Sequence, residues 1–274
     1  MFAAPRTRRG FLADVGQGMF TASLGWAAAV DMGLTSQVWA DGDDVPLTFG
    51  EHERLVALMQ ETPADKLLPV LVDRLKSGTP LQTLLVAGVL SNARTFGGED
   101  YVGFHTLMAL GPSLAMSNEL PTERAALPVL KVLYRNAARI QEAGGRSAET
   151  LRSVPEPLTN AALDPLDLRD ACRRIDIPLA ERTLATLTSQ DAKTAFNAVL
   201  LEVADETEVH RVNLAYRAWD LLGVVGPEHA LTMLRQSVRY CIKAERNYRD
   251  QTRIALARVL DQFNLEGMTP GDRR

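Results

Sequence analysis

Apolar residues recur every three or four positions along most of this chain, which is the spacing of an amphipathic α-helix. Leu55, Val56, Leu58 and Met59 show this spacing in one of the first such segments. No run of alternating apolar and polar residues is long enough to form a strand. The pattern therefore predicts an all-α protein with about ten helices.

Residues that favour helix ends lie between these segments. Thr48 and Glu51 have the spacing of a capping box. Thr62-Pro63 and Thr79-Pro80 each place a hydroxyl group before a proline, a combination typical of a helix start. Glycine accepts the left-handed conformation that ends many helices. We expect it to do so at three places: Gly78, Gly97-Gly98 and Gly144-Gly145.

Three prolines lie inside apolar periodic runs: Pro69, Pro112 and Pro128. An interior proline removes a backbone hydrogen bond and costs about 3 kcal/mol unless it falls in the first turn. We therefore expect Pro128 to start its helix and Gly111-Pro112 to mark a kink.

Two long segments of the chain resemble one another. The first segment begins at Thr79 with TPLQTLLVAGVLSNAR, and the second begins at Ser189 with SQDAKTAFNAVLLEVAD. Two further helical runs follow each of these stretches, and they also align. The alignment places His105 on His210. It also places one basic stripe on another: Lys131, Arg135 and Arg139 on Arg235, Arg239 and Lys243. These matches predict an internal duplication, and the alternative is chance similarity between two leucine-rich helical stretches.

The duplication divides the chain into related halves at about residues 62–145 and 177–248. Residues 146–168 connect them and contain three prolines, but their leucine and valine residues make the connection too apolar for a free linker. We therefore expect a single domain over residues 41–274, built as an α-α superhelix or as two packed bundles.

The first 40 residues have the features of an export signal. A basic start is followed by an uncharged, moderately apolar run from Phe20 to Val30, and Ala40 precedes a polar segment. The motif Thr7-Arg8-Arg9-Gly10-Phe11-Leu12 resembles that of twin-arginine signal peptides, with Ala13 in place of the usual lysine. The resemblance implies export of a folded bacterial protein to the periplasm or another extracytoplasmic space. The alternative is an amphipathic cytoplasmic helix that happens to carry two arginines.

The composition is that of a globular protein with an acidic surface. Apolar residues make up 46% of the 274 residues, and the net charge is −4. Removing residues 1–40 takes away three basic and two acidic side chains, which leaves 27 Lys and Arg against 32 Asp and Glu. This balance predicts no nucleic-acid partner. Nothing after residue 40 is apolar for long enough to span a membrane.

Cys172 and Cys241 are the two cysteines of the chain. An exported location permits one disulfide between them, and the alternative is two free thiols packed as small apolar residues. Two cysteines exclude a zinc site built from cysteine alone, and the chain lacks the Cys-x-x-Cys-His motif of haem attachment.

All four histidines lie near expected helix starts: His52, His105, His210 and His229. Acidic residues accompany each one, and imidazole and carboxylate groups together bind first-row transition metals. A duplicated pair, His105 and His210, would meet across a pseudo-twofold axis, so we consider a metal site there. Histidines that only cap a helix or bond a turn are the alternative. The His-Glu-x-x-His and Glu-x-x-His spacings of well-known metal sites are absent.

The two basic stripes have tyrosines beside them. Arginine binds carboxylate and phosphate groups through a planar fork of donors. One prediction is therefore a groove for an anionic ligand, with these residues lining it: Lys131, Tyr134, Arg135, Arg235, Arg239 and Tyr240. A solvated helix face paired with acidic neighbours is the alternative.

Signatures of common enzymes are missing, including the Gly-x-Ser-x-Gly elbow and the phosphate loop. The segments Phe104-His105-Thr106-Leu107-Met108-Ala109 and Pro227-Glu228-His229-Ala230-Leu231 resemble all-helical proteins of the questin-oxidase-like kind. No catalytic residue is carried over from that resemblance, and whether the chain is an enzyme stays open.

Two functions follow as hypotheses. The first is an exported helical-repeat protein that binds a protein partner or a small anionic ligand in the groove between its halves, without catalysis. The second is a metal- or cofactor-dependent oxidoreductase that uses His105 and His210.

Overall fold

The computed structural model describes residues 45–154, 158, 163–206, 208–245, 258, 259 and 262. Contacts divide the chain between Met1–Asp44 and Val45–Arg274, and the fold described below belongs to the second unit. The predicted signal residues lie outside the described residues: Arg8, Arg9, Phe11, Leu12 and Ala40.

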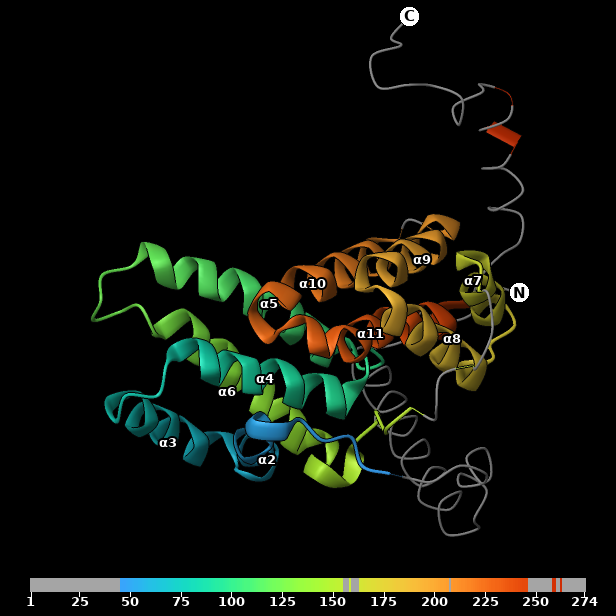
Figure 1. Ribbon diagram of the computed structural model, residues 1–274. Helices are drawn as coiled ribbons and strands as arrows, with labels where there is room; N and C mark the ends of the chain where they lie inside the picture. The colour runs from blue at the N-terminus through green and yellow to red at the C-terminus, as the bar shows by residue number, and fades with distance from the viewer. Residues whose placement is uncertain are drawn as a thin grey trace, which may run out of the picture. The chain divides into compact units, whose positions relative to one another are not determined.

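The described part of the chain contains ten α-helices and three short 3₁₀-helices, and no strand beyond an isolated bridge between Pro46 and Arg152 (Figure 1). In chain order the elements are η1 (Gly50–His52), α2 (Glu53–Glu61), α3 (Ala64–Lys76), α4 (Leu81–Phe96), α5 (Tyr101–Glu119), α6 (Leu127–Ala143), η2 (Gly145–Ala148), α7 (Pro165–Arg173), α8 (Ile177–Gln190), α9 (Ala192–Asp205), α10 (Val209–Val225), η3 (Pro227–His229) and α11 (Ala230–Glu245). The all-α prediction and the expected number of helices are confirmed.

Glycine ends the helices where the sequence predicts it. Gly97 follows α4 with φ +54°, Gly144 follows α6 with φ +111°, and Gly78 lies after α3 with φ +93°. A side chain would be strained at these angles. Pro128 lies in the first turn of α6, also as predicted.

The predicted helix starts are only partly correct. Thr48 and Glu51 form no capping box, because the chain first makes the η1 turn and the Phe49 N–H donates to the carboxylate of Glu53 instead. Pro63 and Pro80 are themselves the N-cap residues of α3 and α4, and neither helix has a side-chain cap.

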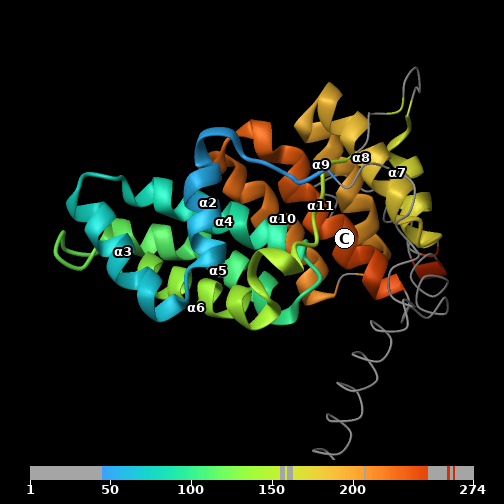
Figure 2. The ribbon, with the colours of Figure 1, turned by 90° about the horizontal axis from the view of Figure 1, so that it is seen from below.

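Helix α4 occupies the centre of the first group of helices. Every residue from Leu84 to Gly98 is buried, since α4 packs against α2, α5 and α6 and also against α10 and α11. Both ribbon views show α10 and α11 between the group α2–α6 and the group α7–α9 (Figures 1 and 2). One continuous hydrophobic core runs through all of these helices.

The connection between α6 and α7 is tied to the core. Leu151 is fully buried, and its N–H donates to the carbonyl of Arg94 over 3.0 Å. The Ser153 N–H donates to the carbonyl of Val45 over 3.0 Å. The expectation that this connection is not a free linker is confirmed for the part that the structure describes.

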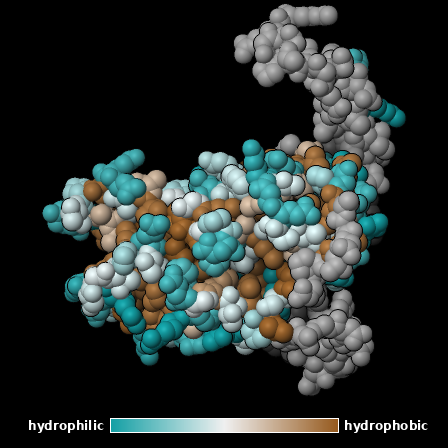
Figure 3. All heavy atoms as spheres, in the orientation of Figure 1, coloured by the Kyte–Doolittle hydropathy of each residue, from teal (hydrophilic) through white to brown (hydrophobic). Residues whose placement is uncertain are grey.

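The surface mixes hydrophobic and hydrophilic residues, as the face in Figure 3 shows. Several large apolar side chains are exposed on α5 and α10, among them Tyr101, Met116, Val209, Val212 and Tyr216. No helix among the described residues is long and apolar enough to cross a membrane.

Candidate functional site

The structure brings His105 and His210 together, although 105 positions separate them in the sequence. His105 lies in the first turns of α5 and His210 is the second residue of α10. Their ring centroids are 5.1 Å apart, and the ring planes meet at 71°. The two helices run side by side in the same direction, because Gly111 of α5 lies against Asp220 and Leu221 of α10.

Aromatic rings surround the two imidazoles. The ring of Tyr101 is tilted by 47° against that of His105, with centroids 4.4 Å apart. The ring of Phe104 stacks on His105 at 4.8 Å and lies 5.2 Å from His210. Tyr240 of α11 lies 5.3 Å from Phe104. Together with Glu208, these residues form what we call the imidazole–aromatic cluster: Tyr101, Phe104, His105, Glu208, His210 and Tyr240.

In each imidazole of the cluster, the Nδ1 atom lies within hydrogen-bond distance of an acceptor oxygen. The Nδ1 atom of His105 lies 2.6 Å from the carbonyl oxygen of Tyr101, and that of His210 lies 2.5 Å from Oε1 of Glu208. Carbonyl and carboxylate oxygens accept hydrogen bonds, so both Nδ1 atoms must carry the proton. In the neutral rings, the lone pair is therefore on Nε2.

Glu208 orders the second half of the cluster. Its carboxylate accepts hydrogen bonds from the backbone N–H groups of His210 and Arg211 and so caps α10. It also accepts a hydrogen bond of 3.0 Å from the hydroxyl of Tyr240. Burial raises the pKa of Glu208, but these hydrogen bonds outweigh burial and hold its pKa below the usual value. Burial and the neighbouring carboxylate raise the pKa of Tyr240.

The cluster is partly open to solvent. Tyr101 is 66% exposed and the side chain of His210 is 22% exposed, whereas Phe104 is buried beneath them. The two imidazoles are therefore partly exposed to solvent, next to the buried ring of Phe104.

The remaining two histidines form a second pair, which the sequence does not predict. His52 and His229 have ring centroids 6.2 Å apart, beside the ring of Phe49. In this pair, Nε2 of His52 lies 3.9 Å from a carboxylate oxygen of Glu51. Burial lowers the pKa of His229, and the nearby His52 lowers it further.

Two of the three residues in the second basic stripe are buried, whereas Lys243 is exposed. Arg235 and Arg239 are 2% and 7% exposed, and both bind Glu181 of α8 over 2.9 Å. Arg239 also binds Glu99. These arginines join α11 to α8 and to the turn after α4, because an unpaired guanidinium in the interior would be too costly.

The first stripe is more exposed. Lys131, Tyr134 and Arg135 lie on the outer face of α6, where Arg135 pairs with Glu142 over 3.3 Å. The structure thus gives the two stripes different surroundings, and their role in anion binding stays a prediction. Tyr240 lies in the imidazole–aromatic cluster instead of beside an exposed stripe.

Both stripes nevertheless end at the turn between α4 and α5. Arg139 binds Asp100 there through two hydrogen bonds, and Lys243 donates to the carbonyl of Glu99 over 2.7 Å. A hollow of about 210 Å³ lies at this turn, with these residues in its lining: Thr95, Phe96, Glu99, Asp100, Ala143, Ala148 and Thr150. Its two carboxylates already have cationic partners, so we assign it no ligand.

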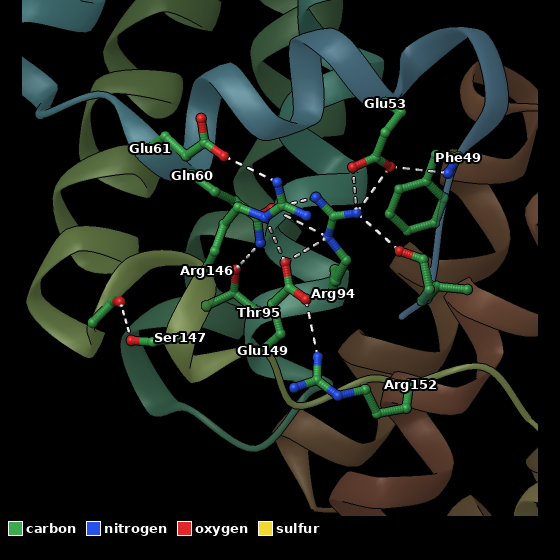
Figure 4. A network of polar contacts seen from close by, with 12 residues as sticks. Phe49, Glu53, Gln60, Glu61, Arg94, Thr95, Arg146, Ser147, Glu149 and Arg152 are labelled. Atoms are coloured by element: carbon green, nitrogen blue, oxygen red, sulfur yellow. Dashed lines mark hydrogen bonds and ion pairs between the residues drawn. The ribbon is translucent and has the colours of Figure 1, made fainter. Parts of the chain in front are cut away.

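Arg94 is the centre of a buried polar network that the sequence does not predict (Figure 4). Its side chain is 1% exposed and binds Glu53 over 2.8 Å and Glu149 over 3.1 Å, together with Gln60. Glu149 in turn pairs with Arg152 over 2.9 Å. The network holds α2, α4 and the segment after η2 together, which is a structural role.

A second buried polar group lies in the α7–α11 part of the molecule. Glu202 is fully buried, and burial raises its pKa to about 8, whereas Cys172 and the charge of Arg211 lower it. Cys172 and Cys241 are free and buried, and burial raises the pKa of both thiols. The reading as free, packed thiols agrees with this arrangement.

Sequence reasoning finds the histidine pair but misses Tyr101. The signal was available, because Tyr101 precedes His105 by four residues and such pairs meet on a helix. Arg94 gave no signal, since its partners lie far away in the sequence.

Within the described residues, no group of three or more His, Cys, Asp or Glu side chains is arranged to hold a metal ion. Comparisons with protein-family models, with curated proteins and with solved structures gave no match.

Proposed function

We propose that this chain is a binding protein without catalysis of its own, and that its ligand binds at the imidazole–aromatic cluster. The observation that carries this proposal is the contact between His105 and His210 from two distant helices. Both rings offer an Nε2 lone pair, because their Nδ1 protons are engaged by Tyr101 and Glu208.

The chemistry of the cluster suggests the kind of ligand. The aromatic rings favour a flat, apolar face, and the two Nε2 atoms favour hydrogen-bond donors. A small phenol or catechol combines both features. We prefer this to the anionic ligand that the basic stripes predict, because Arg235 and Arg239 already bind carboxylates.

The cluster would then lie between two halves that derive from one doubled unit, which is also a proposal. Helices α2–α6 have 9, 13, 16, 19 and 17 residues, and α7–α11 have 9, 14, 14, 17 and 16. Helix α5 belongs to the first set and α10 to the second. The contact between their histidines is what a pseudo-twofold arrangement would produce.

Buried polar side chains support the doubling at matching positions. Asn92 of α4 and Thr106 of α5 hydrogen-bond over 3.0 Å, and both are buried. The sequence alignment places Asn92 on Glu202 and Thr106 on Arg211, and Arg211 donates to the carbonyl of Glu202 over 3.2 Å. Equivalent positions would thus carry polar contacts in both halves.

We further propose export by the twin-arginine route to the periplasm or another extracytoplasmic space, on the resemblance of residues 1–40. Replacing Arg8 and Arg9 by lysine should keep the precursor in the cytoplasm. Export of that variant at the normal level would refute the proposed route.

The metal-dependent oxidoreductase is the second candidate, because the same histidine contact favours it. The two candidate functions differ in whether the bound molecule is chemically converted. An enzyme would consume a substrate at a rate that falls with His105→Gln, whereas a binding protein would release the ligand unchanged.

Ligand-observed NMR tests the binding proposal, with phenol and catechol fragments added to the full chain in excess chelator. We expect saturation transfer to fragments that is lost in the double variant His105→Gln, His210→Gln. The matched control is His52→Gln, His229→Gln, which also removes two partly exposed imidazoles and should retain binding. Absence of any fragment signal, or an equal loss in both variants, would contradict the proposal.

A further inference from the structure

We propose that the imidazole–aromatic cluster also binds one divalent first-row transition-metal ion, through Nε2 of His105 and Nε2 of His210. This inference rests on the proposed function, since it assigns a ligand class to the same cluster. The ions that suit two neutral imidazoles are Cu²⁺, Ni²⁺ and Zn²⁺.

The tautomers of both rings are already those that a metal needs. A metal binds the unprotonated nitrogen, and the other nitrogen normally donates to a carboxylate or a backbone carbonyl. Nδ1 of His210 has the carboxylate of Glu208 as its acceptor, and Nδ1 of His105 has the carbonyl of Tyr101. The two kinds of outer partner that orient metal-binding histidines are therefore both present.

The separation of the ring centroids is compatible with one ion shared between the two imidazoles. Metal–nitrogen bonds of about 2.0–2.1 Å at a tetrahedral angle place the centroids of two imidazoles about 5 Å apart. The observed separation is 5.1 Å. The rings also meet at 71°, so they do not stack face to face.

The site would have two protein ligands and open positions. No third His, Cys, Asp or Glu joins the two histidines within the described residues, and Glu208 is engaged by Nδ1 of His210 and by Tyr240. Water or a small ligand would complete the coordination, which agrees with the partial exposure of the cluster. A phenol or catechol bound there would supply oxygen ligands.

The second histidine pair is a natural control for this inference. His52 and His229 have a larger separation of 6.2 Å, and Nε2 of His52 faces the carboxylate of Glu51. At this larger separation we expect no ion to be shared by His52 and His229. Because the chain has four histidines in total, the two double variants account for all of them.

The test uses the untagged full chain, freed of metal by a chelator and then dialysed against Cu²⁺ or Zn²⁺ alone. We expect about one ion per chain by elemental analysis, and a Cu²⁺ electron paramagnetic resonance spectrum with coupling to two imidazole nitrogens. His105→Gln and His210→Gln should each weaken binding at least tenfold, whereas His52→Gln, His229→Gln should leave it unchanged. Glu208→Gln should weaken binding by about 10–100-fold as the loss of an orienting partner, and circular dichroism checks that it folds.

Uptake of less than about a tenth of an ion per chain at ~100 μM metal would overturn the inference, because an open two-histidine site should fill at that concentration. Equal uptake by wild type and His105→Gln, His210→Gln would do the same. Fragment binding in excess chelator is measured separately. If fragments bind but no metal is taken up, the proposed function stands and only the metal inference fails. If metal is taken up but no fragment binds, only the phenolic ligand is refuted.

Discussion

At the scale of single residues, Glu202 shows how burial changes the chemistry of a side chain. The pKa of this fully buried carboxyl group rises from 4.5 to about 8, chiefly because burial disfavours the charged form. The folded state therefore holds a proton that the unfolded chain releases between these two pH values. Glu202 thus stabilises the fold below about pH 4.5, and this contribution is lost as the pH rises towards 8.

The variant Glu202→Gln tests this effect. Glutamine stays neutral at every pH, so the loss of stability between pH 5 and pH 8 should be smaller in the variant than in wild type. Urea unfolding at the two pH values measures the difference. A variant whose stability falls as steeply as that of wild type would show that Glu202 does not titrate in this range.

Arg239 and Arg135 allow a second comparison, since the sequence alignment treats them as equivalent. Arg239 is buried between Glu181 and Glu99, whereas the side chains of Arg135 and its partner Glu142 are each 50% exposed. Arg239→Ala should lower the free energy of unfolding by about 3 kcal/mol, because it removes one of the two arginines that bind the buried Glu181 and also the arginine partner of Glu99. Arg135→Ala should cost no more than about 0.5 kcal/mol. Equal losses in chemical denaturation would contradict the difference in burial.

Single residues also mark the limit of sequence reasoning about the site. His105 and His210 are predicted as a pair because they align, and the structure places them in contact. The burial of Arg235 and Arg239 is not predicted, since a helical pattern counts arginine as an exposed residue. Their partner Glu181 lies more than fifty positions away, and only the packing of α8 on α11 reveals it.

At the scale of elements, the turn between α4 and α5 is held against the backbone of α11. Gly98 has φ +82°, and a Cβ atom there would lie 2.2 Å from the carbonyl oxygen of Gln236. Because that atom belongs to the backbone of a buried helix, it has little freedom to move.

Gly98→Ala and Gly78→Ala separate this contact from backbone strain. Gly78 also has a positive φ, of +93°, but nothing lies within 4 Å of its added Cβ atom. Both variants should pay the strain of the left-handed conformation, and Gly98→Ala should lose about 2 kcal/mol more through the clash. Thermal unfolding of both variants measures this, and equal losses would contradict the close approach of α11.

Helices themselves were largely predictable because their signals are local. Apolar periodicity and the glycines at 78, 97 and 144 predict elements that the structure confirms. The capping box at Thr48 and Glu51 is wrong because the chain makes a 3₁₀ turn first, with Phe49 packed into the core. Which helices pack together depends on contacts between distant residues and had no comparable signal.

At the scale of the whole molecule, one continuous core joins α2–α6 to α7–α11. Helices α10 and α11 contact α4 as well as their neighbours in sequence, so neither set buries its apolar surface alone. The proposed halves should consequently unfold together, even if they derive from a doubled unit.

A chain that begins at residue 41 provides the test of this cooperativity. Trp219 is then the sole tryptophan, since Trp26 and Trp39 lie in the first 40 residues, and it stacks on Phe196 in the second set. Its fluorescence should change at the same urea concentration as the helical circular dichroism signal. Two separate midpoints would show that the sets are independent.

The central claim is that His105 and His210 both present an unprotonated Nε2 atom at the imidazole–aromatic cluster. Long-range proton–nitrogen NMR correlation of the histidine rings measures this directly, at about pH 8 where free imidazole is neutral, with assignment by the single glutamine variants. The account predicts that both rings carry their proton on Nδ1, held by Tyr101 and Glu208, and that Zn²⁺ shifts the two Nε2 resonances. Protonated Nε2 atoms on either ring would contradict it.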